Sequence, residues 1–383
     1  MSYFHRCFTA ATGFCLVSCL LGCSNGTAKN APTAPPTSAL PTITAKAKFA
    51  YTGNQGGSLS GYAVNPSSGA MTPLSGFPLA MAGNPTVITH DPQNRFLIVG
   101  DIANSQLHVL AIDSTTGALA EISPSPYATI KEPVSLIVDP AGTHVYVASQ
   151  GENKVGAYNL SSTGILTGIA GAPFSTGSTS DTFTGGSSSI LTDAAGKFLY
   201  VQDAVNLYVF SIDNISGAPA LLQTVHSGYG GGIALDPAGQ YLYAVGSGSN
   251  FILTYGIDSV SGLLRLVKSS PMVKQNGAYT ISVSPNGQFA YTIENNNDLV
   301  SYAIKSGDFI PVGKTYSGVY GDQIAVDPSG SFVYVPQSCS NCFSGVYNVV
   351  NEFSIGNTGA LTPLSESAVA AGVTPSGITV TSQ

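Results

Sequence analysis

The sequence predicts an all-β fold, a seven-bladed β-propeller with four antiparallel strands in each blade. The first observation is a glycine after a small residue, which recurs about every 50 residues, at Gly69, Gly117, Gly164, Gly217, Gly262, Gly307 and Gly359. The second is a turn mark, Asp-Pro or a close variant, which begins at positions 91, 139, 193, 236, 284 and 327. Self-similarity at a fixed period of this length is the signature of a repeat architecture.

One repeat shows how four strands arise. Residues 134–138 form an apolar run, and the turn Asp139-Pro140-Ala141-Gly142 follows it. Residues 145–147 and 155–160 are rich in the β-branched and aromatic residues that favour strands. A second turn at Thr163-Gly164 precedes the start of a fourth strand. The alternation of short strands and turn residues predicts an antiparallel sheet of four strands.

The seventh repeat is split between the two ends of the chain. Residues 48–52 read as a second strand with no first strand before them, and residues 375–381 read as a first strand with no second strand after them. Pairing the two segments would complete the seventh blade and close the ring. Closure also removes the exposed strand edges that an open array would leave.

Charge and composition exclude one class of partner. Charged residues make up 9% of the chain, the formal net charge is −7, and the arginines are Arg6, Arg95 and Arg265. A nucleic-acid-binding protein needs a basic stripe, and this sequence has none. We therefore expect no nucleic-acid partner.

The first residues predict export and a lipid anchor. Residues 1–22 read as a secretory signal whose apolar stretch ends in Leu20-Leu21-Gly22-Cys23. This ending resembles the bacterial lipoprotein signal, in which the cysteine carries the lipid; an ordinary cleaved signal is the alternative. Residues 23–44 are rich in Pro, Thr and Ala and predict an extended tether before a propeller over residues 45–383. We expect a lipid-anchored protein of the bacterial cell envelope, on the outer membrane, whose contact with the membrane is through the anchor only.

Two further cysteines remain after the signal and its cysteine. Cys339 and Cys342 are separated by two residues in a loop, and in an oxidising envelope a short disulfide is their simplest interpretation. A redox-active pair is the alternative, although such pairs usually open a helix in a βαβ unit. Phe343 excludes a covalent haem motif, and two thiols supply half of a zinc site. We expect no metal and no cofactor.

The segments from Pro133 to Gly142 and from Val145 to Val155 resemble the lactonase-type propellers, which include bacterial 6-phosphogluconolactonase and the related surface repeats with a Tyr-Val-Thr-Asn signature. The resemblance covers nearly all of residues 45–383. It implies a seven-bladed propeller and a lactone (carboxylic ester) hydrolase with His and Arg around the mouth of its channel. The repeat alignment puts neither residue type there.

The same alignment identifies the residues at the mouth of the channel. We define the mouth ring as two positions per blade at the start of the innermost strand: Thr86, Val134, Ser188, Gly231, Tyr279, Asp322 and Ser376, followed by Val87, Ser135, Ser189, Gly232, Thr280, Gln323 and Gly377. The acidic residues expected on this face are Asp101, Glu152, Asp203, Glu294, Asp298 and Asp322. Carboxylates and amides suit a cation or sugar hydroxyls, and solvated loop residues are the plainer interpretation.

Two hypotheses for function follow. The first is a monomeric binding module without the family's His and Arg, which holds a small molecule, glycan or protein at the mouth through Tyr279, Asp322, Gln323, Glu294 and Ser188. The second is a lactone hydrolase with a diverged catalytic set, for which His226, Glu294 and Asp322 are the candidates. His226 is included because it precedes Gly230-Gly231-Gly232 at the mouth.

Overall fold

The computed structural model describes residues 45–176, 189–228, 230–337 and 348–383, all of which belong to one compact unit. The predicted signal and tether, with Cys23, lie outside the described residues, as do Ser188, Cys339 and Cys342. The described part contains no helix that is long and apolar enough to cross a membrane.

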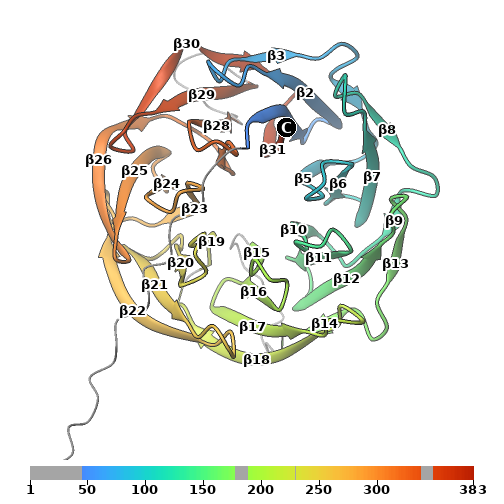
Figure 1. Ribbon diagram of the computed structural model, residues 1–383, viewed down its shortest axis with the longest axis horizontal. Helices are drawn as coiled ribbons and strands as arrows, with labels where there is room; N and C mark the ends of the chain where they lie inside the picture. Colours follow the sequence, from blue (N-terminus) through green and yellow to red (C-terminus); the bar gives the residue numbers. More distant parts are fainter. Residues whose placement is uncertain (1–44, 177–188, 229, 338–347) are drawn as a thin grey trace, which may run out of the picture. The chain divides into compact units, whose positions relative to one another are not determined.

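The described residues form seven antiparallel sheets arranged around a channel, which confirms the predicted all-β propeller (Figure 1). From the channel outward, blade 1 consists of β31 (Pro375–Ser382), β1 (Ala47–Asn54), β2 (Ser58–Val64), β3 (Met71–Pro73) and β4 (Leu79–Ala80). Blade 2 consists of β5 (Pro85–His90), β6 (Phe96–Asp101), β7 (Gln106–Ile112), β8 (Leu119–Glu121) and β9 (Tyr127–Ala128). Blade 3 consists of β10 (Pro133–Val138), β11 (His144–Ser149), β12 (Lys154–Leu160), β13 (Leu166–Gly168) and β14 (Phe174–Ser175). In these three blades the outermost strand is divided into two short pieces, and both pieces pair with the third strand.

Blades 4 to 7 each have four continuous strands. Blade 4 consists of β15 (Ser189–Thr192), β16 (Phe198–Gln202), β17 (Asn206–Ile212) and β18 (Pro219–His226), and blade 5 of β19 (Ile233–Leu235), β20 (Tyr241–Ala244), β21 (Phe251–Ile257) and β22 (Leu264–Pro271). Blade 6 consists of β23 (Ala278–Val283), β24 (Phe289–Glu294), β25 (Asp298–Lys305) and β26 (Asp308–Ser317), and blade 7 of β27 (Ala325–Val326), β28 (Phe332–Gln337), β29 (Val349–Ile355) and β30 (Leu361–Ala370).

The chain closes the ring as the split repeat predicts. β31 pairs with β1 in antiparallel register, with Thr52 opposite Ile378 and Ala50 opposite Val380. Ile378 and Val380 are buried in a cluster with residues of blades 1 and 7, such as Tyr334. The C-terminal strand therefore completes the innermost position of blade 1 and joins this blade to blade 7.

The recurring glycine meets a tyrosine of the second strand at the interface between neighbouring blades, and this tyrosine recurs in six of the seven blades, four residues after the turn residue in blades 3 to 7. The tyrosine hydroxyl of a second strand donates to the carbonyl of the glycine in the next blade, as in Tyr146 Oη to Gly217 O at 2.8 Å. The same bond joins Tyr51 to Gly117, Tyr200 to Gly262, Tyr291 to Gly359 and Tyr334 to Gly69. Two blades differ from this pattern. Blade 2 has Ile98 in place of the tyrosine, and in blade 5 the hydroxyl of Thr254, rather than that of Tyr243, donates to the carbonyl of Gly307. The 50-residue period thus reflects a repeated contact between blades.

Removal of one of these hydroxyls should lower stability measurably. In Tyr146→Phe the buried carbonyl of Gly217 loses its partner, and we expect a loss of about 1–2 kcal/mol in the free energy of unfolding. Denaturant-induced unfolding measures this loss. Tyr279→Phe is the matched control, because Tyr279 is 40% exposed at the channel mouth. Equal effects of the two substitutions would contradict a stabilising role for the bond.

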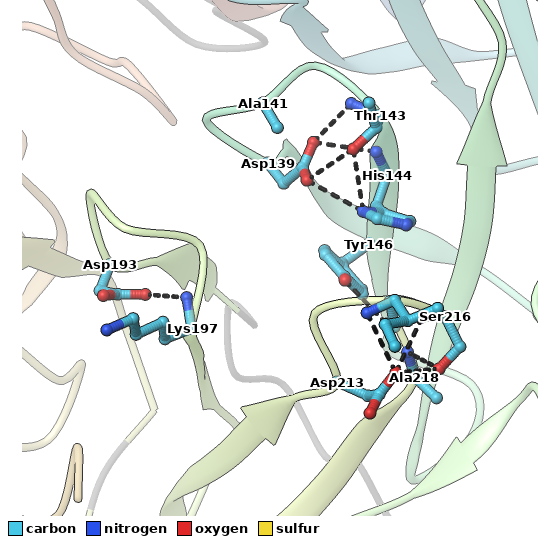
Figure 2. Close-up of polar contacts among 12 residues, drawn as sticks. Asp139, Ala141, Thr143, His144, Tyr146, Asp193, Lys197, Asp213, Ser216 and Ala218 are labelled. Carbon is cyan, nitrogen blue, oxygen red and sulfur yellow. Dashed lines mark hydrogen bonds and ion pairs between the residues drawn. The ribbon is translucent and has the colours of Figure 1, made fainter. Parts of the chain in front are cut away.

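The aspartate of the turn mark organises the hairpin between the first and second strands. In Figure 2, Asp139 Oδ1 accepts from the backbone amides of Thr143 (2.6 Å) and His144 (2.9 Å), and Oδ2 lies 2.9 Å from His144 Nδ1. Burial acts to raise the pKa of Asp139, but the hydrogen bonds from His144 and Thr143 outweigh it and hold the pKa below its usual value. Asp91, Asp193 and Asp327 make the corresponding backbone bonds.

A second set of aspartates caps the turn before the outermost strand. Asp213 accepts hydrogen bonds from the backbone amide and the hydroxyl of Ser216, and these bonds lower its pKa (Figure 2). Asp113 and Asp258 are held in the same way by Thr116 and Ser261. In blade 1 the same position is Asn65, whose side-chain oxygen accepts from the amides of Ser67 and Ser68.

These pKa shifts predict that stability falls in acid. A carboxyl with a lower pKa in the folded state stabilises the fold above its unfolded pKa of about 3.9, and this contribution is lost as the pH falls through the folded pKa. A variant with Asp113, Asp213 and Asp258 all changed to Asn keeps the turn geometry that Asn65 shows and should lose less stability in acid. Thermal unfolding followed from neutral pH to below pH ~4 tests this. Parallel curves for the variant and the wild type would count against it.

Candidate functional site

A cavity of about 470 Å³ lies at one end of the channel, and every described position of the mouth ring lines it. This confirms where the repeat alignment places these residues. Val87, Val134, Gly231, Gly232 and Gly377 make the apolar and backbone part of the wall. The polar part consists of Thr86, Ser135, Ser189, Tyr279, Thr280, Asp322, Gln323 and Ser376.

Four lining residues lie outside the mouth ring. Gln55, Ile102 and Gln150 each directly follow the last residue of a second strand, and Asn84 precedes β5. The ring positions were identified by counting from the turn mark, and from the loops after the second strands only acidic residues were considered as candidates. The end of each second strand in the repeat alignment is the signal that would have identified Gln55, Ile102 and Gln150.

The seam of the ring forms one wall of the cavity. Ser376 on β31 donates to Asp322 Oδ2 at 2.8 Å, and Gln323 Oε1 accepts from the backbone amide of Ile378 at 2.6 Å. Both bonds cross from blade 7 to blade 1. Asp322 is otherwise exposed, so its carboxylate faces the solvent of the cavity. The strand that closes the ring therefore also positions the acidic residue of the site.

Tyr279 is the one aromatic residue among the described residues that line the cavity. It lies on β23 in blade 6, next to the blade that carries Asp322, and 40% of it is exposed. The neighbouring ring position in blade 5 is Gly231, where an added Cβ would lie 2.5 Å from the carbonyl oxygen of Val245. The backbone of blade 5 therefore excludes a side chain at this ring position.

Glu294 does not line the cavity. It is buried at the end of β24, where its carboxylate accepts from Tyr302 Oη (2.7 Å) and from the backbone amide of Lys274 (2.9 Å). Burial raises the pKa of Glu294, although these hydrogen bonds act in the opposite direction. The structure therefore gives this residue a bonding role inside blade 6, away from the predicted ligand contacts.

His226 is also away from the mouth. It ends the outermost strand β18, opposite Asn206 of β17, with its side chain exposed at the rim of blade 4. The predicted set of His226, Glu294 and Asp322 is not brought together, because the three residues lie on an outer strand, inside a blade and at the mouth. Three other histidines take side-chain partners: His90 with Thr379, His108 with Glu121 and His144 with Asp139.

Most of the other predicted acidic residues are also committed inside the fold. Asp101 accepts from the amides of Asn84, Ala103 and Asn104, and Asp203 accepts from Val205, Asn206 and Tyr208. Asp298 is buried beside Asn296 and Lys274. Asp322 alone of the predicted acidic residues lines the mouth cavity within the described part of the chain. In the same part, no group of three or more His, Cys, Asp or Glu side chains could hold a metal.

A second cavity, of about 430 Å³, lies between blades 2 and 3. Thr129 and Tyr158 form part of its wall, and Tyr158 Oη donates to Thr129 Oγ1 at 2.8 Å. Glu152 and Lys154 lie at the same cavity and pair with each other at 3.2 Å. Glu152, predicted on the mouth face, thus belongs to this second cavity.

Seven four-stranded blades closed by the terminal strands, with a polar cavity at the channel mouth, define a ligand-accessible seven-bladed β-propeller. The sequence profile described as Lactonase, 7-bladed beta-propeller matches residues 27–138 and 133–280. The chain therefore belongs to this lactonase family, as the resemblance in sequence indicated. No functionally curated protein matches the chain.

Solved structures share the fold. A protein of Bacteroides uniformis assigned as a 6-phosphogluconolactonase is 19% identical, covers 88% of this chain and 99% of its own, and superposes with a TM-score of 0.74. The periplasmic gluconolactonase PpgL of Pseudomonas aeruginosa is 20% identical, with coverage of 87% and 98% and a TM-score of 0.71. At these identities the likeness establishes the architecture and leaves the chemistry to the site.

Proposed function

We propose that this protein is a binding module of the lactonase family that holds a polyhydroxylated small molecule at the channel mouth. The observation that carries the proposal is the wall of the cavity. Hydroxyls of Thr, Ser and Tyr and amides of Gln and Asn surround it, at a volume within the usual range for small-molecule sites. Groups that both donate and accept hydrogen bonds match sugar hydroxyls.

The described residues that line the mouth cavity include neither the His nor the Arg expected for the family, and this favours binding over catalysis. Hydrolysis of a lactone needs an activated water and a group that stabilises the developing oxyanion. No His, Arg or Lys is among the described residues that line the cavity. Arg95 pairs with Asp91 in a turn between β5 and β6, and Arg265 lies in the outermost strand β22.

Lactone hydrolysis is the second candidate function, and family membership with Asp322 in the cavity favours it. In this alternative the Asp322 carboxylate takes a proton from a water molecule as its oxygen attacks the lactone carbonyl. The ring C–O bond then breaks, its oxygen takes up the proton, and a hydroxy acid results. Of the three catalytic candidates predicted from the sequence, His226, Glu294 and Asp322, only Asp322 lines the cavity.

We also propose that the protein acts in the bacterial cell envelope, anchored by a lipid on Cys23 and separated from the membrane by residues 23–44. The sequence Leu20-Leu21-Gly22-Cys23 supports this proposal. Metabolic labelling of growing cells with a fatty acid should mark the wild-type protein and leave Cys23→Ser unlabelled. Labelling of the variant, or none in the wild type, would contradict the anchor.

Binding and hydrolysis are separated by one pair of assays on the full chain. Calorimetric titration with methyl β-D-glucoside should show saturable binding, which Tyr279→Ala weakens and Leu222→Ala, on the outer strand of blade 4, leaves unchanged. Incubation with D-glucono-1,5-lactone should show no acid release above the spontaneous rate. Acid release that Asp322→Asn abolishes would replace the binding proposal with the hydrolase, and the absence of any glycoside binding would overturn it.

A further inference from the structure

The charges around the mouth cavity are unbalanced. Asp322 is the one titratable acid among the described lining residues, and no cationic side chain accompanies it there. Three lysines that do not line the cavity each pair with a carboxylate: Lys131 with Glu132, Lys154 with Glu152 and Lys274 with Asp298. The wall therefore carries a negative charge without a neighbouring positive one.

The local bonds keep Asp322 in place and leave it accessible. Ser376 Oγ donates to Oδ2 at 2.8 Å, and the residue is otherwise exposed to the cavity. A carboxylate has acceptor capacity on both oxygens, so one bond from Ser376 leaves room for ligand hydroxyls. Gln323 is fixed by the amide of Ile378, which holds the backbone beside Asp322 across the seam.

The aromatic residue of the adjacent blade adds a second recognition element. Tyr279 presents an exposed ring at the same cavity. An aromatic face with an acceptor beside it suits a cyclic polyol, whose C–H face packs on the ring while its hydroxyls donate to the carboxylate. The same carboxylate repels a phosphate or a carboxylate on the ligand.

Building on the proposed function, we infer that Asp322 is a specificity-determining residue that makes the mouth prefer neutral cyclic sugars over phosphorylated sugars and sugar acids. A like charge a few ångströms away across a solvent-filled cavity should weaken binding roughly tenfold. The mechanism is electrostatic, so salt should reduce the discrimination.

The test uses two probes that differ only at C6, which is a hydroxymethyl group in methyl β-D-glucoside and a carboxylate in methyl β-D-glucuronide. Both are titrated calorimetrically into the full chain. The wild type should bind the neutral probe about tenfold more tightly than the anionic one at low salt. In Asp322→Asn, an isosteric change, the two affinities should agree within about twofold. Ser376→Ala keeps the carboxylate charge and should retain the preference. Asp308→Asn, a change on the outer strand β26, is the matched control for loss of a negative charge elsewhere and should also retain it.

The outcomes separate the inference from the proposed function. Equal binding of the two probes by the wild type, or a preference that persists in Asp322→Asn, would overturn the inference and leave the binding module intact. No binding of the neutral probe by the wild type would overturn the proposed function, and the inference with it.

Discussion

Gly69→Ala should lower the free energy of unfolding by about 3–5 kcal/mol, since two costs combine at this position. Gly69 has φ +74°, a conformation that costs a residue with a Cβ about 1–2 kcal/mol. An alanine Cβ would also lie 2.2 Å from Cδ1 of Phe332 in blade 7. Because the carbonyl of Gly69 accepts from Tyr334 of that blade, the turn cannot move away without losing this bond. Denaturant-induced unfolding of the variant against the wild type measures the loss.

A second glycine separates the two costs. Gly239 has φ +69°, and an added Cβ there would have no atom within 4 Å. Gly239→Ala should therefore lose only the conformational part, about 1–2 kcal/mol. If the two substitutions proved equally harmful, packing of the recurring glycine against the next blade would not be the reason for its periodicity.

Removal of residues 375–383 should abolish the folded state. The deletion takes away β31, whose pairing with β1 is the closure of blade 1, and the buried side chains of Ile378 and Val380. Two buried aliphatic side chains contribute about 1.5–3 kcal/mol each, and each of several backbone bonds adds about 1 kcal/mol. This sum approaches the whole stability of a typical domain, about 5–15 kcal/mol. Circular dichroism and a thermal melt of the truncated chain should show no cooperative transition.

A circular permutant is the control for this deletion. It joins residue 383 to residue 45 through a short linker and places the new termini in the turn between β19 and β20, where Pro237, Ala238 and Gly239 are exposed. All strand pairs are then retained, so we expect a cooperative transition close to that of the wild type. A truncated chain that melts like the wild type would mean that β31 does not hold the ring together.

The architecture was predictable because its determinants are local and repeat. Asp139 binds amides four and five residues later, and the glycine of each outer turn has positive φ, so both leave a mark at a constant spacing in the sequence. The closure followed from the same alignment, since residues 48–52 lacked a first strand. The division of the outermost strand in blades 1 to 3 was not anticipated, because the turn marks lie before the fourth strand and carry no information about a break within it.

The mouth ring was predictable for the same reason, whereas the roles of individual polar residues were not. A constant offset from the turn mark placed Tyr279, Asp322 and Gln323 correctly in the wall. The fate of Glu294 depends on Tyr302, which approaches only when β24 and β25 pair. His226 was expected near the mouth because glycines follow it, but the outermost strand extends to that residue.

A crystal structure of the protein with methyl β-D-glucoside would show whether the closed ring builds a sugar-binding mouth. We expect the sugar in the mouth cavity, with its ring against Tyr279 and a hydroxyl donating to Asp322. A sugar bound instead in the cavity between blades 2 and 3, beside Thr129 and Tyr158, or an empty mouth at a saturating concentration, would contradict it.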